Sequence, residues 1–236
     1  MIYDGHDLSH ILKVESIERG LLPGVSVSSA ELGGADGSAF GSASFDVLEI
    51  TVRGRFFAPV SGTIQRRAAI ESKRRELAGI LGKRGLCKLV LDDAPDVWRW
   101  AVLTGETPLE VSTHAAGVSL TFMCPDPIAY GAKRAKRKPA GGRILLDVGG
   151  NSSAAPVVSF ESAGGPSVLK FDGVPFKVMG TSMGAAVVVD AAEHVATADG
   201  RPVAVAIESD YPDLAPGRHE IECAQPFKVE WVERWI

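Results

Sequence analysis

Five histidines are the first residues whose chemistry needs testing, and they are His6, His10, His114, His194 and His219. None belongs to an HExxH pattern or has a second ligand three to five residues away with a cysteine pair upstream, so no zinc-site spacing is present. His6 and His10 are four residues apart, but the strand and turn expected around Asp4-Gly5 do not place them on one helical face. We interpret these two as surface or capping residues.

The three cysteines, Cys87, Cys124 and Cys223, lie far apart and are odd in number. This arrangement fits neither a disulfide framework nor a CxxC metal site. Cys124 and the distant His114 form a conceivable thiol dyad, but Cys124 ends an apolar run and precedes Pro125, a position that favours simple burial. We expect all three thiols to be reduced and buried.

Carboxylates gather in the segment Asp92-Asp93-Ala94-Pro95-Asp96, and Asp126 stands between two prolines. A glycosidase needs two facing carboxylates, and a calcium site needs regularly spaced oxygens with a bidentate Glu. Asp and Pro in these positions are instead typical of tight turns. The GxSxG elbow and the phosphate-binding glycine loops are absent from the sequence. The sequence therefore predicts no catalytic residue, no metal ligand and no cofactor.

The amino-acid composition indicates the class of protein to which these residues belong. The chain has 236 residues, 45% of them hydrophobic and 23% charged, which excludes wholesale disorder. Its net charge of -4 argues against a generally basic nucleic-acid binder. The N-terminus lacks a positive region followed by an apolar run, and the longest uncharged apolar stretch, around Val178 to Val189, is too short for a membrane helix.

Short runs of alternating apolar and polar residues predict a mostly β protein. In residues 117–123, Val118, Leu120 and Phe122 share one face, which is the period of a half-buried strand. Similar patterns predict strands at residues 86–91, 97–103, 143–148, 156–160, 203–207, 219–223 and 227–231.

One segment, about residues 66–83, shows helical spacing instead. Ile70, Leu77, Ile80 and Leu81 fall on one face, and Gly82 marks the expected end. The other face is charged and largely basic. It either is solvated or contacts an acidic partner.

Two glycine-containing segments lack any strand pattern. Residues 132–142 contain Lys133, Arg134, Lys136, Arg137 and Lys138, whose repulsion predicts an exposed linker between a domain at 1–131 and one at 143–236. A nucleic-acid role for this run is disfavoured because no aromatic residue is interleaved to stack bases. The second segment, Leu21 to Gly41, is predicted as a long loop, and loops of this length often contact something else.

An ordered set of short motifs resembles the distal tail (Dit) proteins of long-tailed, non-contractile bacteriophages. The most specific motif ends a strand with Cys124-Pro125-Asp126-Pro127 and continues to Tyr130-Gly131. The others are Ile2-Tyr3-Asp4-Gly5 with Asp7-Leu8-Ser9, Val14 to Ile17, Leu21-Leu22-Pro23, Gly34-Ala35-Asp36-Gly37, Arg74-Arg75-Glu76-Leu77, Leu89-Val90-Leu91-Asp92-Asp93 and Tyr211-Pro212-Asp213-Leu214-Ala215-Pro216-Gly217. The chain departs from the family pattern at Arg218-His219, where Asn is more usual after the glycine, and its 33–37 stretch lacks the usual arginine.

The resemblance implies a mostly β (α+β) chain with an N-terminal β-barrel-like ring domain carrying one helix and a C-terminal galectin-like β-sandwich, whose last strand returns to the first domain in some relatives. It also implies a hexameric ring in the virion, at the tail tip, built from protein made in the host cytoplasm. The implied partners are further copies of the chain, the major tail tube protein, a tail-associated lysin-type hub protein and a receptor-binding protein, without membrane or specific nucleic-acid binding.

Within this expectation, the candidate protomer-contact residues are Leu21, Leu22, Gly34, Asp36, Gly37 and Phe40. The alternative, a loop folded over its own domain, stays open at this point. A different class of function is a carbohydrate-binding module that would stack a sugar on an exposed aromatic residue of the second domain, which offers Phe160, Phe171, Phe176, Tyr211, Phe227, Trp231 and Trp235. An enzyme is the third alternative.

Overall fold

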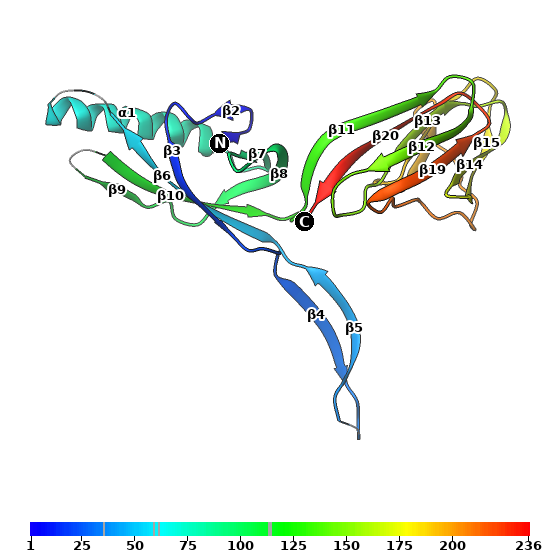
Figure 1. The fold of residues 1–236 in the computed structure, drawn as a ribbon, viewed down its shortest axis with the longest axis horizontal. Coiled ribbons are helices and arrows are strands. Elements are labelled where there is room, and N and C mark those ends of the chain that lie inside the picture. The colour runs from blue at the N-terminus through cyan, green and yellow to red at the C-terminus, as the bar shows by residue number, and fades with distance from the viewer. Residues whose placement is uncertain (35, 59, 61, 113–114) are drawn as a thin grey trace. The chain divides into compact units, whose positions relative to one another are not determined.

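The computed structural model describes residues 1–34, 36–58, 60, 62–112 and 115–236 (Figure 1). The chain divides into two compact units, Met1–Ala129 with Ile236, and Tyr130–Trp235. Each unit has its own hydrophobic core, one formed by residues between Met1 and Cys124 and the other by residues between Ile144 and Trp231. Among the described residues, no helix combines the length and the apolar character that a membrane span requires.

The first unit is built from short strands and a helix. Its elements are β1 (Ile2–Tyr3), β2 (His6–Asp7), β3 (Lys13–Arg19), β4 (Val25–Glu31), β5 (Ser38–Phe45), β6 (Leu48–Phe57), α1 (Thr63–Leu81), β7 (Cys87–Leu91), β8 (Ala94–Thr104), β9 (Leu109–Val111) and β10 (Ala115–Cys124). The main sheet has the antiparallel order β8-β10-β6-β3, and β9 pairs with the part of β10 that β8 does not reach. Strands β1 and β7 pair with each other, and β7 also pairs with β8.

The alternation predicted for residues 117–123 is confirmed in β10. Val118, Leu120 and Phe122 are buried, whereas the residues between them are half-buried. The sheet does not close into a barrel over the described residues, so the barrel-like expectation is corrected to an open sheet. The reason is visible at its edge, where β3 pairs with β6 and has no further strand neighbour in the described part of the chain.

The helix predicted at residues 66–83 is present as α1, and it begins three residues earlier and ends two residues earlier. Ile70, Leu77 and Leu81 are its buried side chains, at the helical spacing that the sequence shows. Gly82 caps its end by donating its backbone N–H to the carbonyl oxygen of Ala78 at 2.9 Å. Most of the remaining helix surface is exposed.

The second unit is a β-sandwich. Its strands are β11 (Ala129–Lys138, whose first residue belongs to the first unit), β12 (Gly142–Val148), β13 (Val157–Glu161), β14 (Gly165–Phe171), β15 (Val174–Thr181), β16 (Ala186–Asp190), β17 (Val195–Ala198), β18 (Arg201–Pro202), β19 (Gly217–Cys223) and β20 (Phe227–Trp235). One sheet has the order β18-β17-β16-β13-β20-β11 and the other β12-β19-β14-β15. The last strand, β20, lies between β13 and β11.

The segment predicted as a linker is strand over most of its length. Residues 132–138 belong to β11, so the linker prediction is wrong there. The Nζ of Lys133 lies 3.0 Å from the carboxylate of Glu230, and Arg134 lies 3.3 Å from that of Glu233. These carboxylates, both on β20, offset the repulsion that the sequence alone suggests.

The prediction of a strand at residues 203–207 is also wrong. Val203 donates its N–H to Ala196 of β17, whereas Val205 forms an isolated bridge with Val178 of β15. The segment divides its hydrogen bonds between two sheets, so no continuous ladder forms. Ile207, which the alternation would bury, is fully exposed.

Candidate interaction surface

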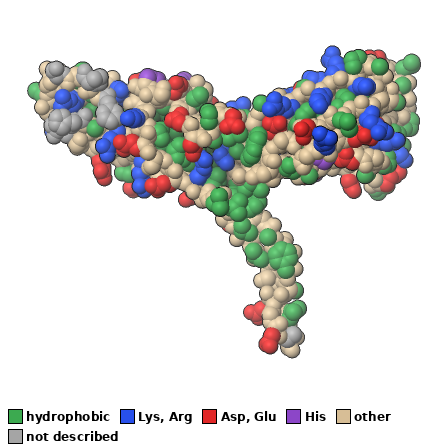
Figure 2. Space-filling view, viewed as in Figure 1, with side chains coloured by type: hydrophobic (Ala, Val, Ile, Leu, Met, Phe, Trp, Pro, Cys, Tyr) green, Lys and Arg blue, Asp and Glu red, His purple; other side chains and the backbone are tan. Residues whose placement is uncertain are grey.

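An antiparallel hairpin carries the predicted protomer-contact residues. Its strands β4 and β5 pair with each other from Val25 opposite Phe45 to Glu31 opposite Ser38. Every residue of both strands is exposed, and apolar side chains run along this ribbon in Figure 2. A two-stranded hairpin exposed on both faces has little buried area to stabilise it. The prediction of a structureless loop is therefore corrected to a hairpin that no described residue of the first unit covers.

A bulge at Gly41 decides which side chains share a face of the hairpin. Ser28 pairs with Ser42 and Ser29 with Phe40, which leaves Gly41 without an opposite residue. Directly paired residues lie on one face, so Phe40 joins the face of Phe45. The first face, here called the apolar face, carries Val25, Val27, Phe40, Ala43 and Phe45 together with Ser29, and Glu31 and Ser38 lie on it toward the turn. The opposite face carries Ser26, Ser28, Ser42 and Ser44, with Ala30 and Ala39.

The exposure of the apolar face is large for side chains of this type. Phe40 is 70% exposed and Val27 is 60% exposed. Leu21, which precedes β4, is 97% exposed, and Leu22 beside it is 55% exposed. Contiguous apolar surface of this kind marks an interaction site in a soluble protein.

The other candidates lie in the turn of the hairpin. Gly34 and Gly37 have φ angles of 79° and 96°, a left-handed conformation that favours glycine. Asp36 is exposed between them, and Ala35 lies outside the described residues. The structure thus places Leu21 and Leu22 before the hairpin, Gly34, Asp36 and Gly37 in its turn, and Phe40 in β5.

The second group of candidates, the motif around Cys124, lies where the first unit ends. Cys124 is the buried last residue of β10, and Pro125 and Pro127 follow it on either side of Asp126. Asp126 Oδ1 accepts a hydrogen bond from the N–H of Ile128 at 3.0 Å, which stabilises the turn.

The last two residues of this motif have their contacts in the second unit. The ring of Tyr130 lies 5.5 Å from the guanidinium of Arg234. A Cβ on Gly131 would lie 2.5 Å from Cζ3 of Trp235, so a larger residue would have to displace the Trp235 ring. These contacts give the motif a structural explanation.

The cysteines are buried and free of disulfides. Burial raises the pKa of the Cys124 thiol to about 11 and also raises the pKa of Cys223, so both side chains stay neutral thiols near neutral pH. His114, the other half of the thiol-dyad alternative, lies outside the described residues. No cluster of three His, Cys, Asp or Glu side chains that could hold a metal occurs among the residues described.

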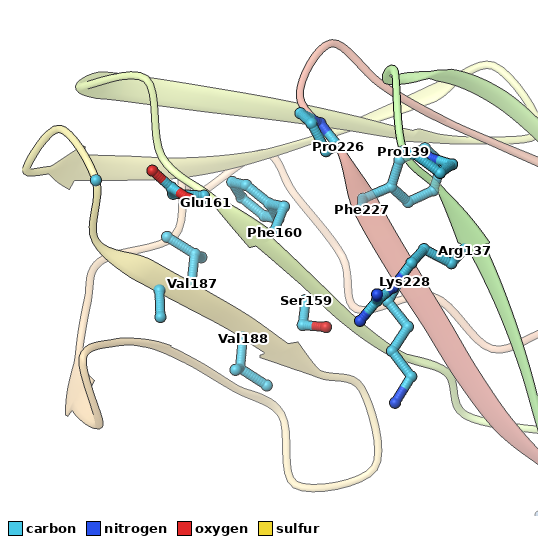
Figure 3. Close-up of a pocket in the computed structure, with 12 residues that line it drawn as sticks. Arg137, Pro139, Ser159, Phe160, Glu161, Val187, Val188, Pro226, Phe227 and Lys228 are labelled. Carbon is cyan, nitrogen blue, oxygen red and sulfur yellow. The ribbon is translucent and has the colours of Figure 1, made fainter.

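A hollow of about 550 Å³ lies within the second unit, over β11, β13, β16 and β20 (Figure 3). Phe160, Val187 and Phe227 contribute apolar lining, whereas Arg137 and Lys228 lie together on one side of it. Glu161 is the one carboxylate among its described lining residues. The hollow therefore lacks the two carboxylates of a glycosidase site.

Comparison with known proteins relates this geometry to a family. The model of a phage tail protein RIFT-related domain matches residues 6–124. The chain belongs to this family. The match lies within the first unit, which carries the hairpin, the open sheet and α1.

One relative extends the likeness of this phage tail protein to the whole chain, in sequence and in structure. The distal tail protein of Bacillus phage SPP1 is 22% identical over 250 residues, which cover 100% of this chain and 95% of that protein. The crystal structure of the SPP1 Dit protein, described as a hub adsorption apparatus of phages that infect Gram-positive bacteria, matches with a TM-score of 0.81 and 17% identity. That match covers 100% of this chain and 98% of the other, so the two proteins share a fold.

These findings confirm the resemblance to the distal tail proteins and the mostly β fold class. They do not favour the carbohydrate-binding alternative. The second unit of this phage tail protein gives a physical reason, because its aromatic side chains form the core. Phe160, Phe171, Phe176, Phe227 and Trp231 are buried, and Tyr211 and Trp235 are half-buried.

Sequence reasoning missed most of the apolar face of this phage tail protein, since Phe40 is the one residue of that face among the candidates. Val25, Val27 and Phe45 were not among the candidates, because the many Gly and Ser residues around them are typical of a loop. The spacing of Val25 and Val27 is a usable signal, since two apolar residues separated by a serine fit a strand.

Proposed function

We propose that this phage tail protein is a structural distal tail protein that works as a hub. In this role, six copies close into a ring at the tail tip of the virion. One side of the ring receives the major tail tube protein, and the other receives a lysin-type hub protein and the receptor-binding protein. The chain acts by fitting against these parts and makes or breaks no bond, so it is not an enzyme.

The observation that carries this proposal is the exposed apolar face of the hairpin. A closed ring uses two different patches on each copy, one of which meets the other on the next copy. Burying an exposed Phe side chain stabilises a contact by about 2 kcal/mol. The apolar face, together with Leu21 and Leu22, supplies one such patch. The family and the shared fold support the same role.

Two measurements test the proposal: the position of the chain in the phage particle and the mass of its oligomers. Antibodies against the chain should label purified phage particles at the distal end of the tail. Native mass measurement of the full chain at rising concentration should show closed oligomers, and negative-stain images should show rings. Particles that attach to their host and lack the chain would overturn the proposal.

A pair of variants links assembly to the hairpin. Phe40→Ser should weaken self-association about thirtyfold, the equivalent of about 2 kcal/mol. Because Phe40 is 70% exposed, the free energy of unfolding of the single chain should stay within about 0.5 kcal/mol of the parent. Ser42→Ala, a change on the opposite face, is the matched control and should assemble as the parent does. Equal assembly of all three proteins would exclude the apolar face as a ring contact.

A further inference from the structure

A second apolar surface lies in the same unit, between α1 and the main sheet. It is a groove of about 300 Å³, here called the α1 groove. Its floor and walls are apolar side chains of α1, β6, β8, β9 and β10, among them Leu77, Leu81, Leu109 and Leu120. Arg74 and Thr107 line it as well, and both are exposed. The Arg74 guanidinium also donates two hydrogen bonds of 2.7 Å to the carboxylate of Glu71 on the same helix. The groove is thus apolar inside, with polar groups open to solvent.

The composition of the hairpin matches that of the groove. Phe40 is a large apolar side chain that stands exposed on the apolar face, and a Phe ring suits a small apolar groove. Glu31 lies on the same face, two cross-strand pairs beyond Ser29, the residue paired with Phe40. The hairpin therefore presents an apolar side chain with a carboxylate close by, and the groove presents an apolar floor with a guanidinium close by.

The charges of the two segments are also opposite. Residues 63–84, which contain α1, hold seven Lys or Arg and two Glu. Residues 20–47, which contain the hairpin, hold three Asp or Glu and no Lys or Arg. Opposite potentials on two surfaces steer them together and set their register. The charged face of α1 has an acidic counterpart within the same sequence.

We propose that the hairpin of one copy docks into the α1 groove of the neighbouring copy, with Phe40 in the groove and Glu31 facing Arg74. This inference rests on the proposed ring and names the receiving surface that a ring requires. The contact is heterologous, because the hairpin of each copy fills the groove of the next, and such contacts generate rings when their rotation closes.

The test is a cross-link across the contact in the full chain. Cysteines are introduced as Phe40→Cys and Thr107→Cys. Because loss of the Phe40 ring weakens assembly, a short bis-maleimide is added at a protein concentration about thirtyfold above that at which the parent is oligomeric. The native cysteines are buried, so the parent chain serves as the blank. We expect a ladder of covalently joined chains that ends at the size of the ring. Ser42→Cys with Thr107→Cys is the matched control, and the ladder should be lost because Ser42 lies on the opposite face.

The outcomes separate the docking from the ring itself. Oligomers that form without the Phe40–Thr107 ladder, equal ladders in both double variants, or a link confined to single chains would each overturn the docking and leave the proposed function standing. A chain that stays monomeric in the mass measurement and is absent from the virion would overturn the proposed function instead.

Charge reversal supplies a second measurement. Glu31→Lys alone and Arg74→Glu alone should each raise the concentration needed for assembly about three- to fivefold, as for an exposed ion pair. The double variant restores the pair with its signs exchanged, so its assembly should recover relative to each single variant. The recovery is incomplete because Arg74→Glu also removes the partner of Glu71. Additive losses in the double variant would contradict the contact.

Discussion

The imidazole of His219 forms hydrogen bonds with two acceptors at once, and this arrangement requires a doubly protonated ring. Its Nδ1 lies 2.7 Å from the carboxylate of Asp172, and its Nε2 lies 2.6 Å from the carbonyl oxygen of Ala215. Both partners accept hydrogen bonds, so both ring nitrogens must donate. Burial by itself would lower the pKa of His219, but the hydrogen bonds to Asp172 and Ala215 outweigh it and hold the pKa above its ordinary value of 6.5.

The raised pKa makes the stability of the second unit depend on pH. The contribution of His219 is fully present below its unfolded-state pKa of about 6.5 and is lost as pH rises through the higher folded-state value. We expect His219→Gln to lower the free energy of unfolding by about 1 kcal/mol near pH 5.5, and by less once the pH exceeds the raised folded-state pKa of His219. Urea denaturation across this pH range measures the difference.

Asp172→Asn is the matched variant for this experiment, because it removes the partner carboxylate and keeps the histidine. It should flatten the pH dependence in the same way. If the difference in free energy of unfolding between the parent and His219→Gln stays constant with pH, the imidazolium is not what stabilises the second unit. The sequence alone marks His219 only as a departure from the family pattern. Its partner is 47 residues away, and the register that aligns β14 with β19 brings the two together.

At the scale of elements, sequence patterns predict those parts whose side chains meet a core. The alternation of Val118, Leu120 and Phe122 and the helical spacing of Ile70 and Leu77 both reflect burial within the chain. The hairpin meets no core in its own unit, so its pattern is weaker. The bulge at Gly41 makes the pattern harder to recognise, since Phe40 and Phe45 share a face although they are five positions apart. Simple alternation would assign them to opposite faces.

The bulge itself can be tested by changing the lengths of the strands. Insertion of one serine between Ser28 and Ser29 gives Gly41 an opposite residue. This change places Phe40 on the opposite face, beside Ser28 and Ser42. We expect self-association to weaken about as strongly as in Phe40→Ser, about thirtyfold. Deletion of Gly41 is the control, because it removes the bulge and keeps Phe40 opposite Ser29. Native mass measurement compares the two, and equal assembly would contradict the assigned faces.

At the scale of the whole molecule, the sequence predicts two domains from a break in its apolar pattern. The break was placed at residues 132–142, but the two compact units meet at Ala129 and Tyr130. The basic run misled the prediction because the acidic side chains that pair with it, Glu230 and Glu233, lie about a hundred residues later. Contacts over such separations leave no local signal in a single sequence.

Because each unit has its own hydrophobic core, we expect each unit to fold without the other, and we expect self-association to depend on the first unit alone. The fragment of residues 130–236 should unfold in one cooperative transition and stay monomeric. The fragment of residues 1–129 contains both the hairpin and the α1 groove, so it should self-associate as strongly as the full chain. Analytical ultracentrifugation of both fragments measures this, with Phe40→Ser in the fragment of residues 1–129 as the control that should dissociate. If residues 130–236 self-associate, or if the 1–129 fragment is folded but monomeric, the ring contact does not lie in the first unit.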